Sequence, residues 1–160
     1  MNITQLREKY KNAHEAYLKY KDTNQTNNIE AAFIPEILKA MNRDLFVVPD
    51  CLLNYLGADL VDLKTGYTYD IKVCQHLHGT EVMIDAYKKN EIALDSKINN
   101  AFVFLNADNI IIVPFKYVYD KVPPREQCFY LKRDLYHTTL KAVIDVKDCR
   151  KLVIPRSSTN

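Results

Sequence analysis

Two carboxylates and a lysine are concentrated in one short segment of this chain. Asp59 lies eleven residues before the triplet Asp70-Ile71-Lys72. Apolar-rich runs at 57–63 and 67–74 flank a turn signal, Lys64-Thr65-Gly66, so we expect a β-hairpin. Side chains alternate along a strand, which puts Asp70 and Lys72 on one face, and the hairpin brings Asp59 toward Asp70. Two carboxylates and an ammonium at one sheet edge predict a divalent-metal site that performs a reaction.

The elements around this hairpin predict an α/β fold in a single domain, with a central mixed β-sheet flanked by helices. The chain has 160 residues, of which 48% are hydrophobic and 26% charged, which is enough to bury one core. We expect helices at 3–21, 29–41, 80–98 and 131–139, strands at 45–48 and 152–154, and a second hairpin from 101–105 and 110–115.

Composition excludes several classes of protein. The formal charge is +2 and the pI about 8.2, which permits a nucleic-acid partner without demanding one. The four cysteines (51, 74, 128 and 149) contain no CxxC pair, which argues against a disulfide framework or a four-cysteine zinc site. The N-terminus resembles no signal peptide and no apolar run is long enough to span a membrane, so we expect a cytoplasmic protein.

The acidic-x-Lys triplet alone is weak because the chain contains four of them: Asp62-Leu63-Lys64, Asp70-Ile71-Lys72, Asp95-Ser96-Lys97 and Asp145-Val146-Lys147. The first runs into the predicted turn, and the third lies in a polar segment. Asp145-Val146-Lys147 is the serious rival because 142–146 is strand-like, but it follows no strand that ends in an acidic residue. Asp70-Ile71-Lys72 has that partner strand, and an upstream helix that carries Glu30.

The complete pattern resembles the PD-(D/E)XK nuclease superfamily, and within it the small type II restriction endonucleases most. The matching segments are Asn27 to Ile34 around Glu30, Gly57-Ala58-Asp59, and Tyr69 to Val73. The resemblance covers roughly residues 28 to 75, and Ala58 replaces the nominal proline of the family. It implies a restriction-endonuclease-like fold, with 1–28 as an N-terminal helix and loop, 29–115 as the catalytic core, and 116–160 as C-terminal strands and helix.

The resemblance also implies a role for each matching residue. Asp59, Asp70 and the backbone carbonyl of Ile71 would hold Mg²⁺, with Mn²⁺ as a substitute. Lys72 would orient or activate the attacking water, and Glu30 would complete the site. Glu36 is the alternative to Glu30, but it would project from a different face of the helix. The residue types agree, since Mg²⁺ prefers carboxylate and carbonyl oxygens and makes bound water a nucleophile.

Two other interpretations of the same residues stay open. Asp59, Asp70 and Lys72 would also suit a partly solvated ion-pair cluster that contributes little to stability. If the strand extends far enough, Cys74, His76 and His78 continue its alternation and offer a zinc site. Against zinc, the segment from His76 to Gly79 indicates that the strand ends there. Gln75, His76 and His78 would then be candidates for DNA contact.

The function expected from these observations is a Mg²⁺-dependent endonuclease that hydrolyses DNA phosphodiester bonds. The alternatives are a Holliday-junction resolvase, or another DNA-structure-specific nuclease, and a non-catalytic DNA-binding domain on the same fold. A palindromic DNA target would require a homodimer, because a twofold site mirrors a twofold protein. Lysines and tyrosines are interleaved at 116–121, where they could contact the DNA backbone, although tyrosines at such spacing more often pack half-buried against the core.

Overall fold

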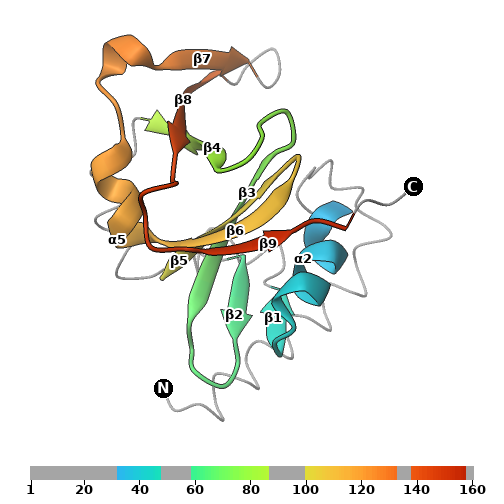
Figure 1. The fold of residues 1–160 in the computed structure, drawn as a ribbon. Helices are drawn as coiled ribbons and strands as arrows, with labels where there is room; N and C mark the ends of the chain where they lie inside the picture. Colours follow the sequence, from blue (N-terminus) through green and yellow to red (C-terminus); the bar gives the residue numbers. More distant parts are fainter. Residues whose placement is uncertain (1–31, 48–58, 87–99, 133–137, 158–160) are drawn as a thin grey trace. The chain divides into compact units, whose positions relative to one another are not determined.

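The computed structural model describes residues 32–47, 59–86, 100–132 and 138–157, drawn in colour in Figure 1. Within these ranges the protein is a mixed α/β structure, rich in strands and with few helices. The chain divides into two compact units. The first contains Met1–Ile71 and Ile98–Asn100, and the second contains Lys72–Lys97 and Ala101–Asn160. The expected organisation as one restriction-endonuclease-like domain stays a prediction.

The first unit contains helix α2, Ile34–Met41, where the sequence predicts a helix over 29–41. Pro35 occupies the first turn, where its missing N–H leaves no hydrogen bond unmade. Ile37 and Met41, spaced four residues apart, are the buried side chains of the helix. Asn42 ends the helix in the left-handed conformation (φ 48°), and its N–H donates to the Leu38 carbonyl at 3.1 Å.

Three antiparallel strands, which begin in the first unit, confirm the predicted short strand and hairpin. Strand β1 is Leu45–Val47, β2 is Leu60–Asp62, and β3 is Thr68–Cys74. Strand β1 pairs with β2, and β2 pairs with β3 in a register that puts Leu60 opposite Tyr69. The turn between β2 and β3 uses Gly66 at φ 75°, a conformation that glycine adopts without strain. Strand β3 continues past Ile71 into the second unit.

The second unit contains the other predicted hairpin, of β5 (Ala101–Asn106) and β6 (Asn109–Pro114). Strand β9, Leu152–Pro155, pairs with β6, so the strand order here is β3-β5-β6-β9. The short helix α5 (Phe115–Val118) follows β6 (Figure 1). It packs on this hairpin, and the centres of the Phe115 and Phe102 rings are 4.0 Å apart. The 3₁₀ turn η3 (Tyr119–Lys121) extends the helix.

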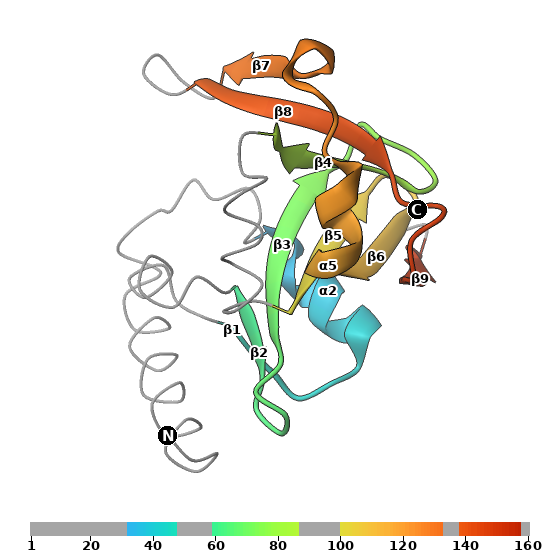
Figure 2. The ribbon, with the colours of Figure 1, turned by 90° about the vertical axis from the view of Figure 1, so that its left-hand side faces the viewer.

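A separate three-stranded antiparallel sheet in the second unit has the order β4-β8-β7, as Figure 2 shows. Its strands are β4 (Glu81–Asp85), β7 (Phe129–Lys132) and β8 (Thr138–Asp145), and the 3₁₀ turn η4 (Arg125–Gln127) precedes β7. Here two sequence predictions are wrong over the residues that the structure describes. Residues 81–85 of the expected helix at 80–98 form β4, whereas 87–98 lie outside the described residues. The described ends of the expected helix at 131–139 belong to β7 and β8, and 133–137 lie outside the described residues.

The physical reason is that pairing along the sheet outweighs local helix propensity. Strand β4 pairs with β8 over five positions, and β8 pairs with β7 over four. Val82 and Ile84 on β4 and Ala142 on β8 enter the core of the unit, and each is less than 2% exposed. In the part of the chain that the structure describes, no helix has the length and apolarity to cross a membrane.

Candidate active site

Asp59 and the segment Asp70-Ile71-Lys72 are joined by a direct hydrogen bond. The backbone N–H of Ile71 donates to Oδ2 of Asp59 at 2.7 Å. The Asp59 N–H in turn donates to the Tyr69 carbonyl at 2.9 Å. Asp59 directly precedes β2, so its side chain supplies an acceptor to β3 just before β2 begins. The structure therefore places the Asp59 carboxylate against the backbone of Ile71, the residue after Asp70.

The direction of the Ile71 backbone follows from this hydrogen bond. In an antiparallel ladder the N–H and the C=O of one residue point toward the same neighbouring strand. The Ile71 carbonyl is therefore directed toward the side of β3 where Asp59 lies. The carboxylate of Asp59 and the carbonyl of Ile71 form one oxygen-rich edge.

Asp70 and Lys72 share a face of β3, as the strand period requires. Both are half-buried, whereas Tyr69 and Ile71 between and beside them are each 1% exposed. A buried apolar face thus fixes the register of the strand and leaves the two charged side chains on the opposite face. A slip of one residue would bury the charges, so the sequence specifies this orientation strongly.

In the other two triplets that the structure describes, 62–64 and 145–147, the aspartate accepts hydrogen bonds within a turn. Oδ1 of Asp62 accepts from the backbone N–H groups of Lys64 and Thr65, at 2.8 and 3.3 Å. Oδ1 of Asp145 accepts from the Thr80 hydroxyl at 2.6 Å and from the Lys147 N–H at 2.9 Å. The Thr80 hydrogen bond, followed by that from Lys147, holds the pKa of Asp145 below its ordinary value. In the rival triplet at 145–147, the aspartate therefore accepts a hydrogen bond within the turn that follows β8.

Lys72 belongs to a group of charges that the sequence did not reveal. Its Nζ lies 3.5 Å from Oδ2 of Asp85 on β4, and the other oxygen of Asp85 is paired with the ammonium of Lys141 on β8. Asp85 and Lys141 stand directly opposite each other in the β4–β8 register. They are 56 positions apart in the chain, so no spacing rule connects them; only the strand pairing does.

Two glutamates, Glu30 and Glu36, were the remaining candidates for the predicted metal site. Glu30 lies outside the described residues, as does the triplet at 95–97. Glu36 lies in the first turn of α2 and is half-buried. Among the described residues, no group of three or more histidine, cysteine, aspartate or glutamate side chains is close enough to hold a metal ion. Of the predicted ligands, the contact that the structure shows here is the one between the Asp59 carboxylate and the backbone of Ile71.

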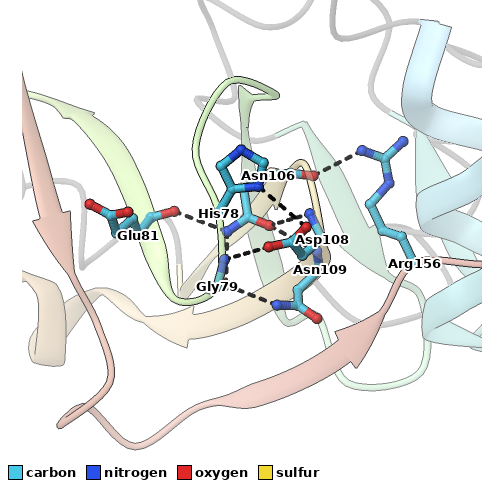
Figure 3. A network of polar contacts seen from close by, with 7 residues as sticks. All are labelled: His78, Gly79, Glu81, Asn106, Asp108, Asn109 and Arg156. Atoms are coloured by element: carbon cyan, nitrogen blue, oxygen red, sulfur yellow. Dashed lines mark hydrogen bonds and ion pairs between the residues drawn. The ribbon is translucent and has the colours of Figure 1, made fainter.

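The predicted DNA-contact residues follow the end of β3. Gln75 and His76 are exposed in the turn after Cys74, and the exposed His78 has its Nδ1 3.4 Å from Oδ1 of Asp108. The Gly79 N–H donates to Oδ2 of Asp108 at 2.7 Å. Figure 3 shows both contacts. The hydrogen bond from Gly79, and after it the one with His78, lower the pKa of Asp108.

Asn106 anchors the same turn from inside and is fully buried. Its amide nitrogen donates to the carbonyls of Gly79 and Glu81, at 2.9 and 3.0 Å. Its Oδ1 accepts from the N–H groups of Asp108 and Asn109, at 3.0 and 2.8 Å (Figure 3). Both donors and both acceptor positions of one amide are thus used, and the turn that carries His78 is held rigidly.

The zinc alternative conflicts with this geometry. Strand β3 ends at Cys74, so the alternation that would align Cys74, His76 and His78 on one face stops there. Cys74 is 2% exposed within the core of the second unit, and burial raises the pKa of its thiol. Zinc binds the thiolate, which this environment disfavours. Among the described residues, these three therefore do not form the shared zinc site that the alternative interpretation would need.

An exposed group of cations surrounds Tyr117 on α5. The ammonium of Lys116 lies 5.0 Å from the centre of the Tyr117 ring. A hydrogen bond from Arg150, and after it one from Lys116, lowers the pKa of the Tyr117 hydroxyl. The Cys149 thiol, next to Arg150, reaches the Tyr117 carbonyl at 3.4 Å, which ties the loop after β8 to α5. The interleaving of lysine and tyrosine in the sequence here presents cationic donors to solvent.

No protein-family model matches this chain, and no curated protein matches it significantly. The assignment of a function to the protein therefore rests on the motif residues and on the contacts described above.

Proposed function

We propose that this protein is a Mg²⁺-dependent endonuclease that hydrolyses DNA phosphodiester bonds, similar to small type II restriction enzymes. The observation that carries the proposal is the hydrogen bond of 2.7 Å between Asp59 and the backbone of Ile71. It sets the carboxylate of one predicted metal ligand against the centre of the acidic-x-Lys triplet. Two of the other triplets have their aspartates occupied by turns, which supports the assignment to Asp70-Ile71-Lys72.

The donor set suits magnesium. The carboxylates of Asp59 and Asp70 and the carbonyl of Ile71 are hard oxygen ligands, which Mg²⁺ prefers while it keeps several waters. Glu30 would complete the set. When bound, the metal would supply a water of lowered pKa and would offset charge on the reacting phosphate. Mn²⁺, another hard cation, would substitute.

The side chains of the protein would contribute binding and orientation. The ammonium of Lys72 is a compact cation that can hold a water or a phosphate oxygen. Lys116 and Arg150 beside Tyr117 would contact the DNA backbone, where phosphate contacts position the duplex. Gln75, His76 and His78, which are exposed after the end of β3, would also contact DNA. If the target is palindromic, the active form is a homodimer.

A cleavage assay with two substrates tests this proposal. Purified protein is incubated with supercoiled plasmid and with a synthetic four-way junction, each with Mg²⁺ or with EDTA. Cutting of the plasmid only in Mg²⁺ supports the endonuclease. Cutting confined to the junction would instead identify a resolvase. DNA binding without any cleavage would identify a non-catalytic domain, and the absence of both would overturn the proposal.

A further inference from the structure

One carboxylate, Asp85, is shared between two lysines from two other strands. Its Oδ2 lies 3.5 Å from Nζ of Lys72, and its Oδ1 is paired with Nζ of Lys141. All three side chains are largely shielded from solvent, with exposed fractions of 11% for Asp85, 23% for Lys72 and 12% for Lys141. All three belong to the second unit. The arrangement is a partly buried Lys–Asp–Lys row.

Such a row restricts the direction of a lysine side chain. A lysine carries its charge on a flexible stem of four carbons, and about 2 kcal/mol of rotamer entropy resists its fixation. Pairing with a shielded carboxylate opposes this freedom more effectively than an exposed ion pair would. Asp85 is itself fixed, because Lys141 stands opposite it in the β4–β8 register and holds the other oxygen.

We infer that Asp85, held by Lys141, is a positioning residue that directs the ammonium of Lys72 for the reaction on β3. The inference rests on the proposed function, because Lys72 is the residue to which the nuclease mechanism assigns the water or the phosphate oxygen. Asp85 acts only through Lys72, and Lys141 acts only through Asp85. The loss of kcat on substitution should therefore be largest at Lys72, smaller at Asp85 and smallest at Lys141.

A double-mutant cycle separates this role from simple stabilisation. Asp85→Asn removes the charge at nearly constant volume and should lower kcat for DNA cleavage by about 100-fold, as a displacement of about 1 Å can. KM for DNA should change little. In a Lys72→Met background the same Asp85→Asn change should cause no further loss. An equal loss in both backgrounds, or an unchanged kcat in Asp85→Asn, would overturn the inference.

Lys141 provides the variant for the case that Asp85→Asn does not fold. Lys141→Met leaves the pair of Asp85 and Lys72 in place, and should lower kcat less than Asp85→Asn does. Lys141→Arg keeps the cation and should restore activity toward that of the wild type. If Lys141→Met and Lys141→Arg lower kcat and the thermal midpoint in parallel, the row is structural and the inference fails.

A labelling measurement tests the positioning contact without any cleavage. The rate at which an amine-reactive reagent modifies Lys72 is followed by mass spectrometry, with the exposed Lys64 and Lys116 as internal references. Release from Asp85 should raise the Lys72 rate several-fold in Asp85→Asn and leave the reference rates unchanged. If the wild type cuts no DNA but the modification rate of Lys72 still rises in Asp85→Asn, the contact between Asp85 and Lys72 is supported and the proposed function is wrong. An unchanged Lys72 rate overturns the positioning role whatever the cleavage assay shows.

Discussion

The carboxylate of Asp59 accepts a hydrogen bond of 2.7 Å from the backbone N–H of Ile71, the middle residue of Asp70-Ile71-Lys72. The contact joins the residue before β2 to the centre of β3, and directs the Ile71 carbonyl toward the same side. Strand pairing needs only a hydrogen-bond acceptor at this position, charged or neutral. A metal site would also require the negative charge of the carboxylate. Substitutions at Asp59 can separate these two roles.

Substitutions at Asp59 should split stability from activity. Asp59→Asn retains a side-chain oxygen that can accept the Ile71 N–H, so stability should change little, while metal-dependent cleavage should disappear with the charge. Asp59→Ala removes the acceptor as well and should cost about 1 kcal/mol of unfolding free energy. Urea denaturation and plasmid cleavage measure the two properties. Cleavage by Asp59→Asn at the wild-type rate would leave Asp59 with a structural role only.

Asn106 should be among the most sensitive polar positions of the second unit. Asn106→Ala leaves the carbonyls of Gly79 and Glu81 and the N–H groups of Asp108 and Asn109 without this partner in a buried site. We expect a loss of about 3 kcal/mol in unfolding free energy, measured by urea denaturation. The matched control is Asn109→Ala, which removes a half-buried amide that donates to the Gly79 carbonyl at 2.8 Å, and should cost about 1 kcal/mol. Equal losses would show that Asn106 does not anchor the turn.

The two hairpins of this protein were predictable because their signals are local. A glycine turn at Gly66 separates β2 from β3, and the polar run from Asn106 to Asn109 separates β5 from β6. Alternation along 67–74 also placed Asp70 and Lys72 on one face. The short strand at 45–47, the C-terminal end of α2 and strand β9 were found from the same kind of local pattern.

The three-stranded sheet was not predictable in this way, because its strands are stabilised by distant partners. The segment 81–85 has apolar residues at both helical and strand spacings, and only the pairing with β8 decides between them. The same pairing puts Lys141 opposite Asp85, so the error at β4 and the failure to find this ion pair have one cause. The burial of Asn106, which looks like an ordinary turn residue in the sequence, likewise depends on contacts to 79–81.

Acid should destabilise the protein partly through Asp108 and Asp145. The hydrogen bonds from the Gly79 N–H and from the Thr80 hydroxyl, respectively, hold their pKa values below the ordinary 3.8. Because the folded pKa is the lower one, the stabilisation is present above pH 3.8 and is lost as the pH falls through the folded pKa. The thermal midpoint of the double variant Asp108→Asn/Asp145→Asn should therefore fall less steeply with acidification than that of the wild type.

The comparison variant for this measurement is Glu126→Gln, which removes an exposed carboxylate from η4. Its acid profile should follow that of the wild type. A double variant whose midpoint falls as steeply as that of the wild type would show that neither aspartate contributes to the acid dependence.

The cations around Tyr117 should contribute to DNA affinity and little to sequence preference. Lys116→Ala and Arg150→Ala each remove one expected phosphate interaction, so affinity should fall on every DNA sequence. The slope of log K against log salt should decrease by about 1 in each of these variants. Fluorescence anisotropy at several salt concentrations measures both quantities. Glu126→Ala, which removes an exposed anion, is the control, and unchanged slopes in both cation variants would show that this face does not bind DNA.

The measurement that tests the central claim most directly compares two aspartates in two similar triplets. Asp70→Asn and Asp145→Asn each neutralise the first residue of an Asp-x-Lys sequence, one in the middle of β3 and one at the end of β8. The initial rate of Mg²⁺-dependent nicking of supercoiled DNA is measured for both variants and the wild type. The proposed site predicts that Asp70→Asn abolishes nicking and that Asp145→Asn retains it near the wild-type rate. Nicking that persists in Asp70→Asn and disappears in Asp145→Asn would contradict the proposed site and move it to β8.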